Sequence, residues 1–553
     1  MSKEPGVTRS VTCILIAHFF RRFFDNDTVQ PDGDTLTTVV RAVSIVAAPG
    51  LMVPFFLQTH YRYLPLWEAI EVRYLFVLLS FVVMGAVSIF EWEMLFPDRL
   101  DFLVLSPLSL KPAQMLAAKA AALVGFLALF LVGSNLFAML LLPAVGRGGF
   151  LHQMLAHGAA VLLAGIFAAL FVLALGGLML CVLDAARFRM ASPIVQSLFV
   201  MVLALFVLHL LQYGNLLHAL LAGPHGMARW MPPFWFLGLY ERLLEGDAAP
   251  AFAREMARYA VRGTALAAAL ALLTYPMAWA RMRRMAMEGA ARTRGRPWQW
   301  LAQVVHLAVR RPGERAAFHF IGQTIARNNR YQIYLAMYCG TGLAFAVQCA
   351  VVYRLGNGGV HATLSYEGLH AVMPLLLFWT VAGLRTAFAF PLSLPAGWVF
   401  RVTGAKLPEC ASGARKWVFA CAVAVMCCVL AALRAAGWDL RQLAVQAVCG
   451  LCLCILLADG LFFSQETVPF NQPRLPGRTN FPLMLTLYVG VFPFFVFVVA
   501  QMAMHLEKKP SGLLLLGLAT ALAHAIAILR TRLQETAEEM EGYEGEFQLL
   551  GLS

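Results

Sequence analysis

Residues 157–182, HGAAVLLAGIFAALFVLALGGLMLCV, decide the fold class of this chain. These 26 residues include no Asp, Glu, Lys or Arg. A helix of about 20 apolar residues crosses the roughly 30 Å hydrocarbon core of a lipid bilayer. Because lipid offers no partners for backbone N–H and C=O groups, a helix is the expected structure of such a segment. The stretch therefore predicts a transmembrane helix.

Apolar runs of comparable length recur along the whole chain. They form two sets of six, which lie at roughly 42–58, 74–90, 117–142, 157–182, 194–213 and 261–280, and at 333–353, 370–390, 417–434, 443–463, 483–504 and 511–529. The sequence therefore predicts an all-α polytopic membrane protein with about twelve transmembrane helices.

The composition agrees with a membrane protein. Of the 553 residues, 60% are hydrophobic and 13% are charged, whereas soluble domains have about 25% charged residues. The net charge of +13 could indicate nucleic-acid binding, but no soluble basic domain exists to carry that function. Basic residues also gather in the cytoplasmic loops of membrane proteins, so we expect no nucleic-acid partner.

The distribution of Lys and Arg predicts the orientation of the spans. Alternate loops carry the excess, and the connector 281–330 alone holds 11 basic residues. Since this excess marks the cytoplasmic side, both termini are expected in the cytoplasm.

The two sets of spans are predicted to be weak copies of one plan. Each set follows a basic amphipathic segment, CILIAHFFRRFF at 13–24 and AFHFIGQTIARNNR at 317–330, which suits a helix lying in the membrane interface. Matching spans cross in the same sense, so we expect two parallel six-helix repeats. The predicted division is a first half at 1–290, a basic connector with its interfacial helix at 291–330, and a second half with a cytoplasmic tail at 331–553.

Motifs of catalysis and of cofactor binding are not evident in the sequence. There is no G-x-x-x-x-G-K-[ST] phosphate loop, no H-E-x-x-H and no G-x-S-x-G. Cys449 and Cys452 form a C-x-x-C inside an apolar run without a second ligand pair, which favours a structural role over a metal site. We therefore expect no catalytic residues, metal or cofactor in this chain.

One polar interruption, EWEMLFPDRLDFLVLSPLSLKPAQMLAAK at 91–119, differs from the other loops. Read as a helix, it gathers leucines on one face and places Asp98, Arg99 and Asp101 on the other or at its start, with Pro97 near its N-terminus. The prolines of SPLSLKP then end the helix before the third span. The segment predicts a short amphipathic helix on the cytoplasmic surface, which could anchor to the membrane or bind a partner.

This segment resembles the coupling element of export-type ABC transporter permeases. The resemblance lies in its position between the second and third spans and in eight residues: Glu91, Asp98, Asp101, Leu105, Ser106, Pro107, Leu108 and Lys119. The segment 13–24 is similar to the connecting helix of the same permeases. Within that superfamily, PLSLPAGWVFRVTGAK at 391–406 and VPFNQPRLPGRTN at 468–480 are similar to a bacterial group of twelve-span proteins.

The resemblance implies a permease subunit of the bacterial cytoplasmic (inner) membrane that works with separate cytoplasmic ATP-binding subunits. ATP and Mg²⁺ would be bound by those partners, and residues 91–119, including Arg99, would contact them. At the corresponding place in the second half, the loop 391–416 offers Trp398 and Arg401 in place of most of the acidic residues. The apolar spans favour a lipid-like or amphipathic cargo.

Two other functions are compatible with the sequence. An ATP-independent carrier or channel could use the same repeat, although it would ordinarily need ionisable groups inside the membrane, and only Arg385 lies well within a predicted span. A membrane-embedded enzyme or a scaffold is the remaining alternative.

Overall fold

The computed structural model describes residues 11–24, 35–92, 94–96, 101, 104–105, 107–108, 110–146, 148–210, 217–218, 220–221, 228–287, 309–356, 359–388, 407–462, 470 and 481–549. The chain divides into two compact units. Unit 1 holds residues 1–195, 202–293 and 354–361, and unit 2 holds residues 196–201, 294–353 and 362–553.

The described elements up to residue 287 are almost all helical. They are α1 (Val11–Arg22), α2 (Thr35–Leu57), η1 (Tyr61–Tyr63), α3 (Leu66–Phe90), α5 (Pro112–Val145), α6 (Phe150–Val182), α7 (Ala185–Leu210), η2 (Ala228–Trp230), α9 (Pro232–Glu245), η3 (Gly246–Ala248) and α10 (Ala251–Met287).

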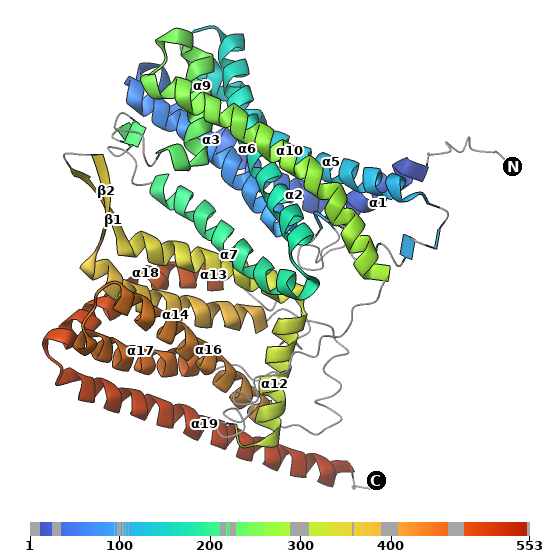
Figure 1. The fold of residues 1–553 in the computed structure, drawn as a ribbon. Coiled ribbons are helices and arrows are strands. Elements are labelled where there is room, and N and C mark those ends of the chain that lie inside the picture. Colours follow the sequence, from blue (N-terminus) through green and yellow to red (C-terminus); the bar gives the residue numbers. More distant parts are fainter. Residues whose placement is uncertain are drawn as a thin grey trace. The chain divides into compact units, whose positions relative to one another are not determined.

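The later elements add one short hairpin to seven helices. They are α12 (Pro312–Arg327), α13 (Asn329–Ala350), β1 (Val351–Gly356), β2 (Gly359–Leu364), α14 (Tyr366–Phe388), α16 (Leu407–Ala435), α17 (Leu440–Leu461), α18 (Phe481–Lys508) and α19 (Gly512–Leu549) (Figure 1). The β1–β2 hairpin was not expected from the sequence, and it connects α13 to α14.

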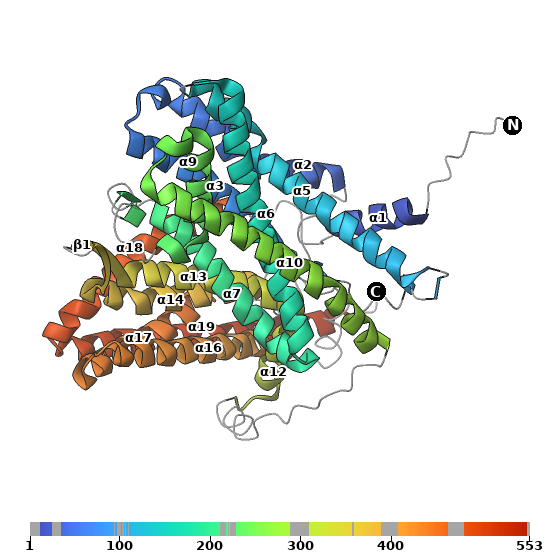
Figure 2. The ribbon, with the colours of Figure 1, turned by 45° about the horizontal axis from the view of Figure 1, so that its top comes forward.

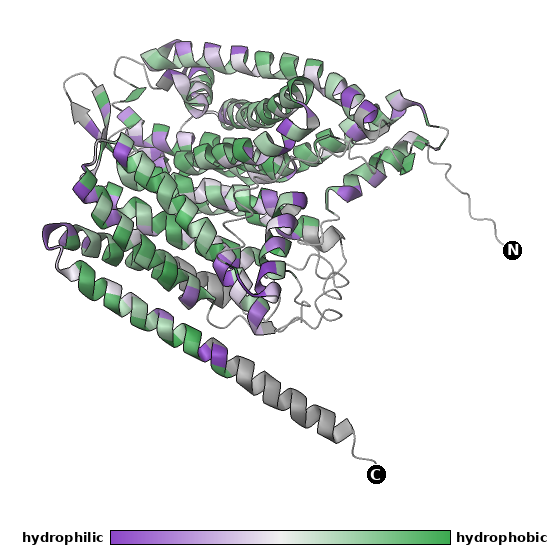
Figure 3. Cartoon of the chain, turned by 60° about the horizontal axis from the view of Figure 1, so that its bottom comes forward, coloured by the Kyte–Doolittle hydropathy of each residue, from purple (hydrophilic) through white to green (hydrophobic). Residues whose placement is uncertain are grey.

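Twelve of the described helices are long and apolar enough to span a membrane. Their apolar parts match the twelve predicted runs, and Figure 3 shows hydrophobic residues along the long helices. Several spans are longer than predicted: α3 begins at Leu66 instead of 74, and α10 begins at Ala251 instead of 261. The prediction of an all-α polytopic membrane protein is confirmed.

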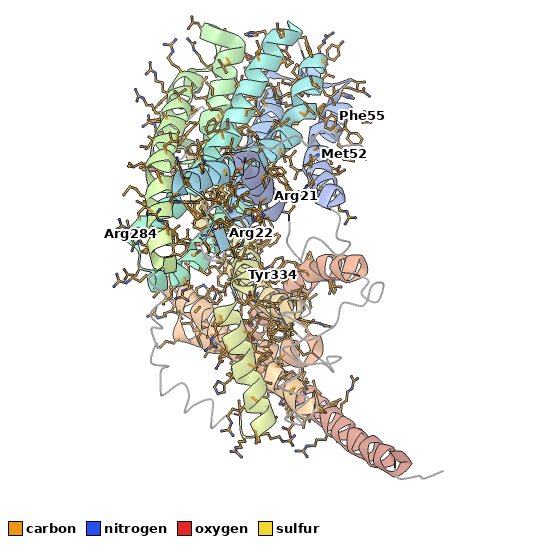
Figure 4. The ribbon with its side chains drawn as sticks, turned by 90° about the vertical axis from the view of Figure 1, so that its right-hand side faces the viewer. Arg21, Arg22, Met52, Phe55, Arg284 and Tyr334 are labelled. Atoms are coloured by element: carbon orange, nitrogen blue, oxygen red, sulfur yellow. The ribbon has the colours of Figure 1, made fainter. Side chains whose placement is uncertain are left out.

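Helix α6 forms the centre of unit 1. It packs against α3, α5, α9 and α10, and small residues let these neighbours approach closely, as is typical of helix interfaces in membranes. Polar side chains also join the helices: Ser80 of α3 donates a hydrogen bond to the carbonyl of Val161 (2.7 Å), and Asn135 of α5 donates one to Ser80 (3.0 Å). By contrast, Met52 and Phe55 of α2 are exposed, as expected of side chains that face lipid (Figure 4).

Helix α14 forms the centre of unit 2. It packs against α13, α16, α17 and α18. The side chains of Leu377, Val381 and Phe388 are completely buried in this core, and Phe378 contacts Phe492 and Phe495 of α18 with ring centroids 5.4 and 5.1 Å apart. Aromatic packing therefore fixes the middle of α18 to α14.

The two units share several packing relationships. In each unit the second span contacts the third and fourth, the third contacts the fourth, and the fourth contacts the sixth. The helix that precedes the first span, α1 or α12, packs on the third span, α5 or α16. The first spans differ, because α2 packs on α5 whereas α13 packs on α14. These shared contacts support the hypothesis of an internal duplication, and the parallel relation of the halves stays a prediction.

Candidate functional site

The candidate site in unit 1 is built on the beginning of α5. Pro112 occupies the first turn of this helix, where its missing N–H costs no hydrogen bond, and Gln114 accepts a hydrogen bond from the backbone of Lys111 (3.2 Å). Helix α1 lies along α5 (Figure 2). Phe23, just after α1, stacks on Phe126 of α5 with ring centroids 4.6 Å apart. The amphipathic segment predicted at 13–24 is therefore a helix that covers the third span.

The segment between α3 and α5 is attached to α1 by charge. Arg22 at the end of α1 forms an ion pair with Asp101, whose side chain is 2% exposed. On α5, the ammonium group of Lys119 lies 5.1 Å from the ring centroids of both Phe19 and Phe23, which is within the range of a cation–π interaction. Figure 4 labels Arg22 and its neighbour Arg21 at this end of α1.

The structure divides the predicted coupling residues into an inward and an outward group. Asp101, Leu105 and Lys119 are buried, whereas Pro107 and Leu108 are exposed. Glu91 is half-buried and caps the C-terminal end of α3. Part of the amphipathic helix predicted within 91–119 lies outside the described residues, as do Asp98, Arg99 and Ser106.

Val104 also belongs to the outward group, although it is not among the coupling residues predicted from the sequence. Its side chain is 65% exposed, and that of Leu108 is 54% exposed. The exposed residues described between 104 and 108 are therefore apolar, whereas the sequence predicts acidic residues on the outer face of this segment.

Unit 2 has an equivalent arrangement at the beginning of α16. Glu314 of α12 is buried, accepts a hydrogen bond from Ser412 (2.7 Å) and forms an ion pair with Lys416 (2.5 Å). Lys416 and Lys119 hold similar places near the start of the third span of each half. Trp398 and Arg401 lie outside the described residues.

The other end of unit 1 holds a polar cluster that the sequence did not predict. It was not predicted because α3 begins earlier than expected and includes Arg73. Arg73 of α3 forms an ion pair with Glu241 of α9 (2.7 Å), whose side chain is 0% exposed. Arg73 also donates a hydrogen bond to Tyr61 (3.4 Å), and its guanidinium carbon lies 5.8 Å from the centroid of the Tyr240 ring. Tyr240 in turn hydrogen-bonds His157 of α6 (3.0 Å).

Burial dominates the electrostatics of this cluster. It raises the pKa of the Glu241 carboxyl, and Arg73 offsets only part of this effect. Burial likewise raises the pKa of Tyr61, and it raises the pKa of Tyr240 well above its ordinary value. A charged carboxylate at Glu241 therefore depends on its contact with Arg73.

The described part of the chain offers little support for a metal site or for redox chemistry at cysteines. No group of three or more His, Cys, Asp or Glu side chains that could hold a metal ion occurs there. Cys449 and Cys452 are buried in α17 as free thiols.

The chain matches no protein-family model, no curated protein and no solved structure.

Proposed function

We propose that this multi-pass membrane protein is the permease of an ABC-type exporter, with both six-span halves fused in one chain. The observation that carries the proposal is the two-sided segment between α3 and α5. Asp101 binds it to Arg22 of α1, while Val104, Pro107 and Leu108 face outward. An element that transmits force needs one face fixed to the permease and another face free to bind a partner.

Helix α5 supplies the mechanical connection. It runs for 34 residues, which corresponds to about 50 Å at 1.5 Å per residue. A displacement of the 91–119 segment would move the N-terminal end of this helix and, through the buried Lys119, helix α1 as well. ATP and Mg²⁺ would be bound and hydrolysed in the partner subunits, so the chain itself would not be an enzyme.

The equivalent contacts in unit 2 support binding of two ATPase subunits to one chain. Glu314 and Lys416 join α12 to α16, whereas Arg22 and Asp101 join α1 to the segment that precedes α5. The predicted placement in a bacterial inner membrane with both termini in the cytoplasm, and a lipid-like or amphipathic cargo, belong to the same proposal.

Co-purification with an ATPase tests the proposal. The permease would be co-expressed with a phosphate-loop protein encoded next to it, and ATPase recovery would be measured in detergent and in nanodiscs. Asp101 is a poor probe because its replacement breaks the contact with Arg22. Val104→Glu and Leu108→Glu alter only the outward group, so we expect at least a several-fold loss of bound ATPase with unchanged thermal stability.

The matched control is Arg187→Glu, which changes an exposed side chain (77%) at the start of α7 and should leave ATPase recovery unchanged. Equal recovery with both outward variants, or no recovered ATPase with the unaltered chain, would contradict the proposal.

An ATP-independent carrier is the second candidate. One observation favours it: His370 and Glu507, in the end turns of two candidate spans, are 2.9 Å apart, although the sequence showed no such ionisable pair. Ionisable groups within membranes commonly serve ion or proton transport. Transport by the purified chain in vesicles without ATP or an ATPase would favour the carrier over the exporter.

A further inference from the structure

A buried histidine and a carboxylate meet where α14 and α17 begin and α18 ends. His370 of α14 is 0% exposed, and its Nε2 lies 2.9 Å from Oε2 of Glu507 on α18. The other ring nitrogen, Nδ1, lies 2.9 Å from the backbone carbonyl oxygen of Tyr366. Both ring nitrogens therefore face oxygen atoms.

The two oxygen neighbours of the His370 ring determine how many protons His370 and Glu507 hold together. A carbonyl oxygen only accepts hydrogen bonds, so Nδ1 must carry a hydrogen. Neutral imidazole then has no hydrogen on Nε2, whose lone pair would face the Glu507 carboxylate. The contact becomes attractive when one further proton lies on Nε2 or on Glu507. The pair thus binds one proton in the closed arrangement.

The remaining bonds fix the carboxylate. Oε1 of Glu507 accepts hydrogen bonds from the Tyr366 hydroxyl (2.9 Å) and from Nε2 of Gln442 on α17 (2.8 Å). Trp438, just before α17, packs against the His370 ring with centroids 4.6 Å apart. Three helices consequently meet at one protonatable pair.

The polar environment continues one turn further along α17. Gln446 is four residues from Gln442, on the same helical face. It is 2% exposed, and its Nε2 has no hydrogen-bond partner among the described residues. A buried amide in this position suits a water molecule, through which a proton could enter or leave the pair.

Among the described residues, the ion pair that involves His370 or Glu507 is the one between them. The titratable group that contacts the pair is Tyr366. The charged residues at the corresponding ends of the packed helices are Glu367 of α14, Arg434 of α16, Asp439 and Arg441 beside or on α17, and His505 and Lys508 of α18. The last turns of α13 carry no charge.

We infer that His370 and Glu507 form a proton-binding site that fastens the end of α18 to α14 and α17, and that loss of the proton releases this end. The Phe378 contacts with Phe492 and Phe495 would hold the middle of α18 in place. Release would therefore change the end of α18 without unfolding unit 2. This inference does not depend on the exporter proposal, because it concerns contacts within unit 2 alone.

Fluorescence of Trp438 tests the inference in the full chain in nanodiscs. Its contribution is the difference between the unaltered chain and Trp438→Phe, recorded while the pH is varied. We expect one proton-dependent step. Glu507→Gln should abolish it, since Gln can donate to Nε2 of neutral His370 and accept from Tyr366.

Hydrogen exchange gives a second measurement. Protection at the end of α18, corrected for intrinsic exchange rates, should fall several-fold as pH rises through the step, and it should stay constant in Glu507→Gln. His524→Gln is the control, because it alters a separate His–carboxylate pair of unit 2, His524 with Asp459 at 2.6 Å, and should retain the step. A missing step in the unaltered chain, or an undiminished step in Glu507→Gln, would overturn the inference.

Discussion

Arg22 and Asp101 form an ion pair that joins the interfacial helix α1 to the polar segment between α3 and α5. The two residues come from parts of the chain on either side of the first two spans. Asp101 is 2% exposed and Arg22 is 23% exposed, so the pair is shielded from water mainly on the acidic side. This contact holds the predicted connecting helix and the predicted coupling segment together.

Breaking this pair should destabilise the protein. Removal of one partner from a buried pair costs about 3–5 kcal/mol, and the partial exposure of Arg22 reduces the expected loss for Asp101→Asn to about 1–3 kcal/mol. Thermal unfolding of the purified chain measures the effect. Asp184→Asn, which alters an exposed pair with Arg187, should cost less than about 1 kcal/mol, and an equal loss in both variants would refute the interpretation.

The equivalent contact in unit 2 should show coupling between its partners. Glu314→Gln and Lys416→Met each remove the same ion pair. In a double-mutant cycle, the two effects on unfolding free energy should therefore be non-additive by about 1–2 kcal/mol. Additive effects would show that the contact contributes nothing to stability. Glu409→Gln, in the first turn of α16, gives a comparison that leaves the pair intact.

The number of spans could be predicted because each depends on a local property of the sequence. An uninterrupted apolar run such as 157–182 needs no tertiary information. The exact start of α3 could not be predicted, since Glu68, Glu71 and Arg73 resemble loop residues when their surroundings are unknown. In the structure, α9 covers Arg73 and supplies Glu241, which lies 168 residues away in the sequence.

The direction in which individual side chains point could not be predicted from the sequence either. The sequence located the segment 91–119 but suggested that its acids faced outward, whereas Asp101 points to Arg22. His370 resembled any scattered histidine, because its partner Glu507 is separated from it by 137 residues. Charges inside a membrane protein acquire their roles from partners on other helices, and a single sequence does not identify those partners.

Close packing at the centre of unit 1 should not tolerate a larger residue at Gly165. A Cβ atom there would lie 2.5 Å from Cδ1 of Leu131 and 2.8 Å from the Ser80 hydroxyl. Gly165→Ala should therefore lower the free energy of unfolding by about 1–3 kcal/mol. Gly517→Ala on α19 is the control, because nothing lies within 4 Å of its Cβ position, and it should be neutral or slightly stabilising.

The buried carboxyl of Glu241 predicts a specific dependence of stability on pH. Burial raises its pKa above the ordinary value of 4.5 despite the nearby Arg73. Between these two pKa values the folded chain binds more protons than the unfolded chain, so stability falls as pH rises. This contribution is complete below about pH 4.5 and is lost as pH passes through the pKa of the folded state.

Glu241→Gln should remove that contribution, because glutamine does not titrate. We expect the melting temperature of the unaltered chain, relative to that of Glu241→Gln, to be highest at and below about pH 4.5 and to decline toward neutral pH. Glu245→Gln keeps the buried carboxyl and removes only the more distant one, 3.7 Å from Arg73, so it should retain the decline. A melting-temperature difference that rises with pH would mean that the contact with Arg73 outweighs burial and holds Glu241 ionised throughout.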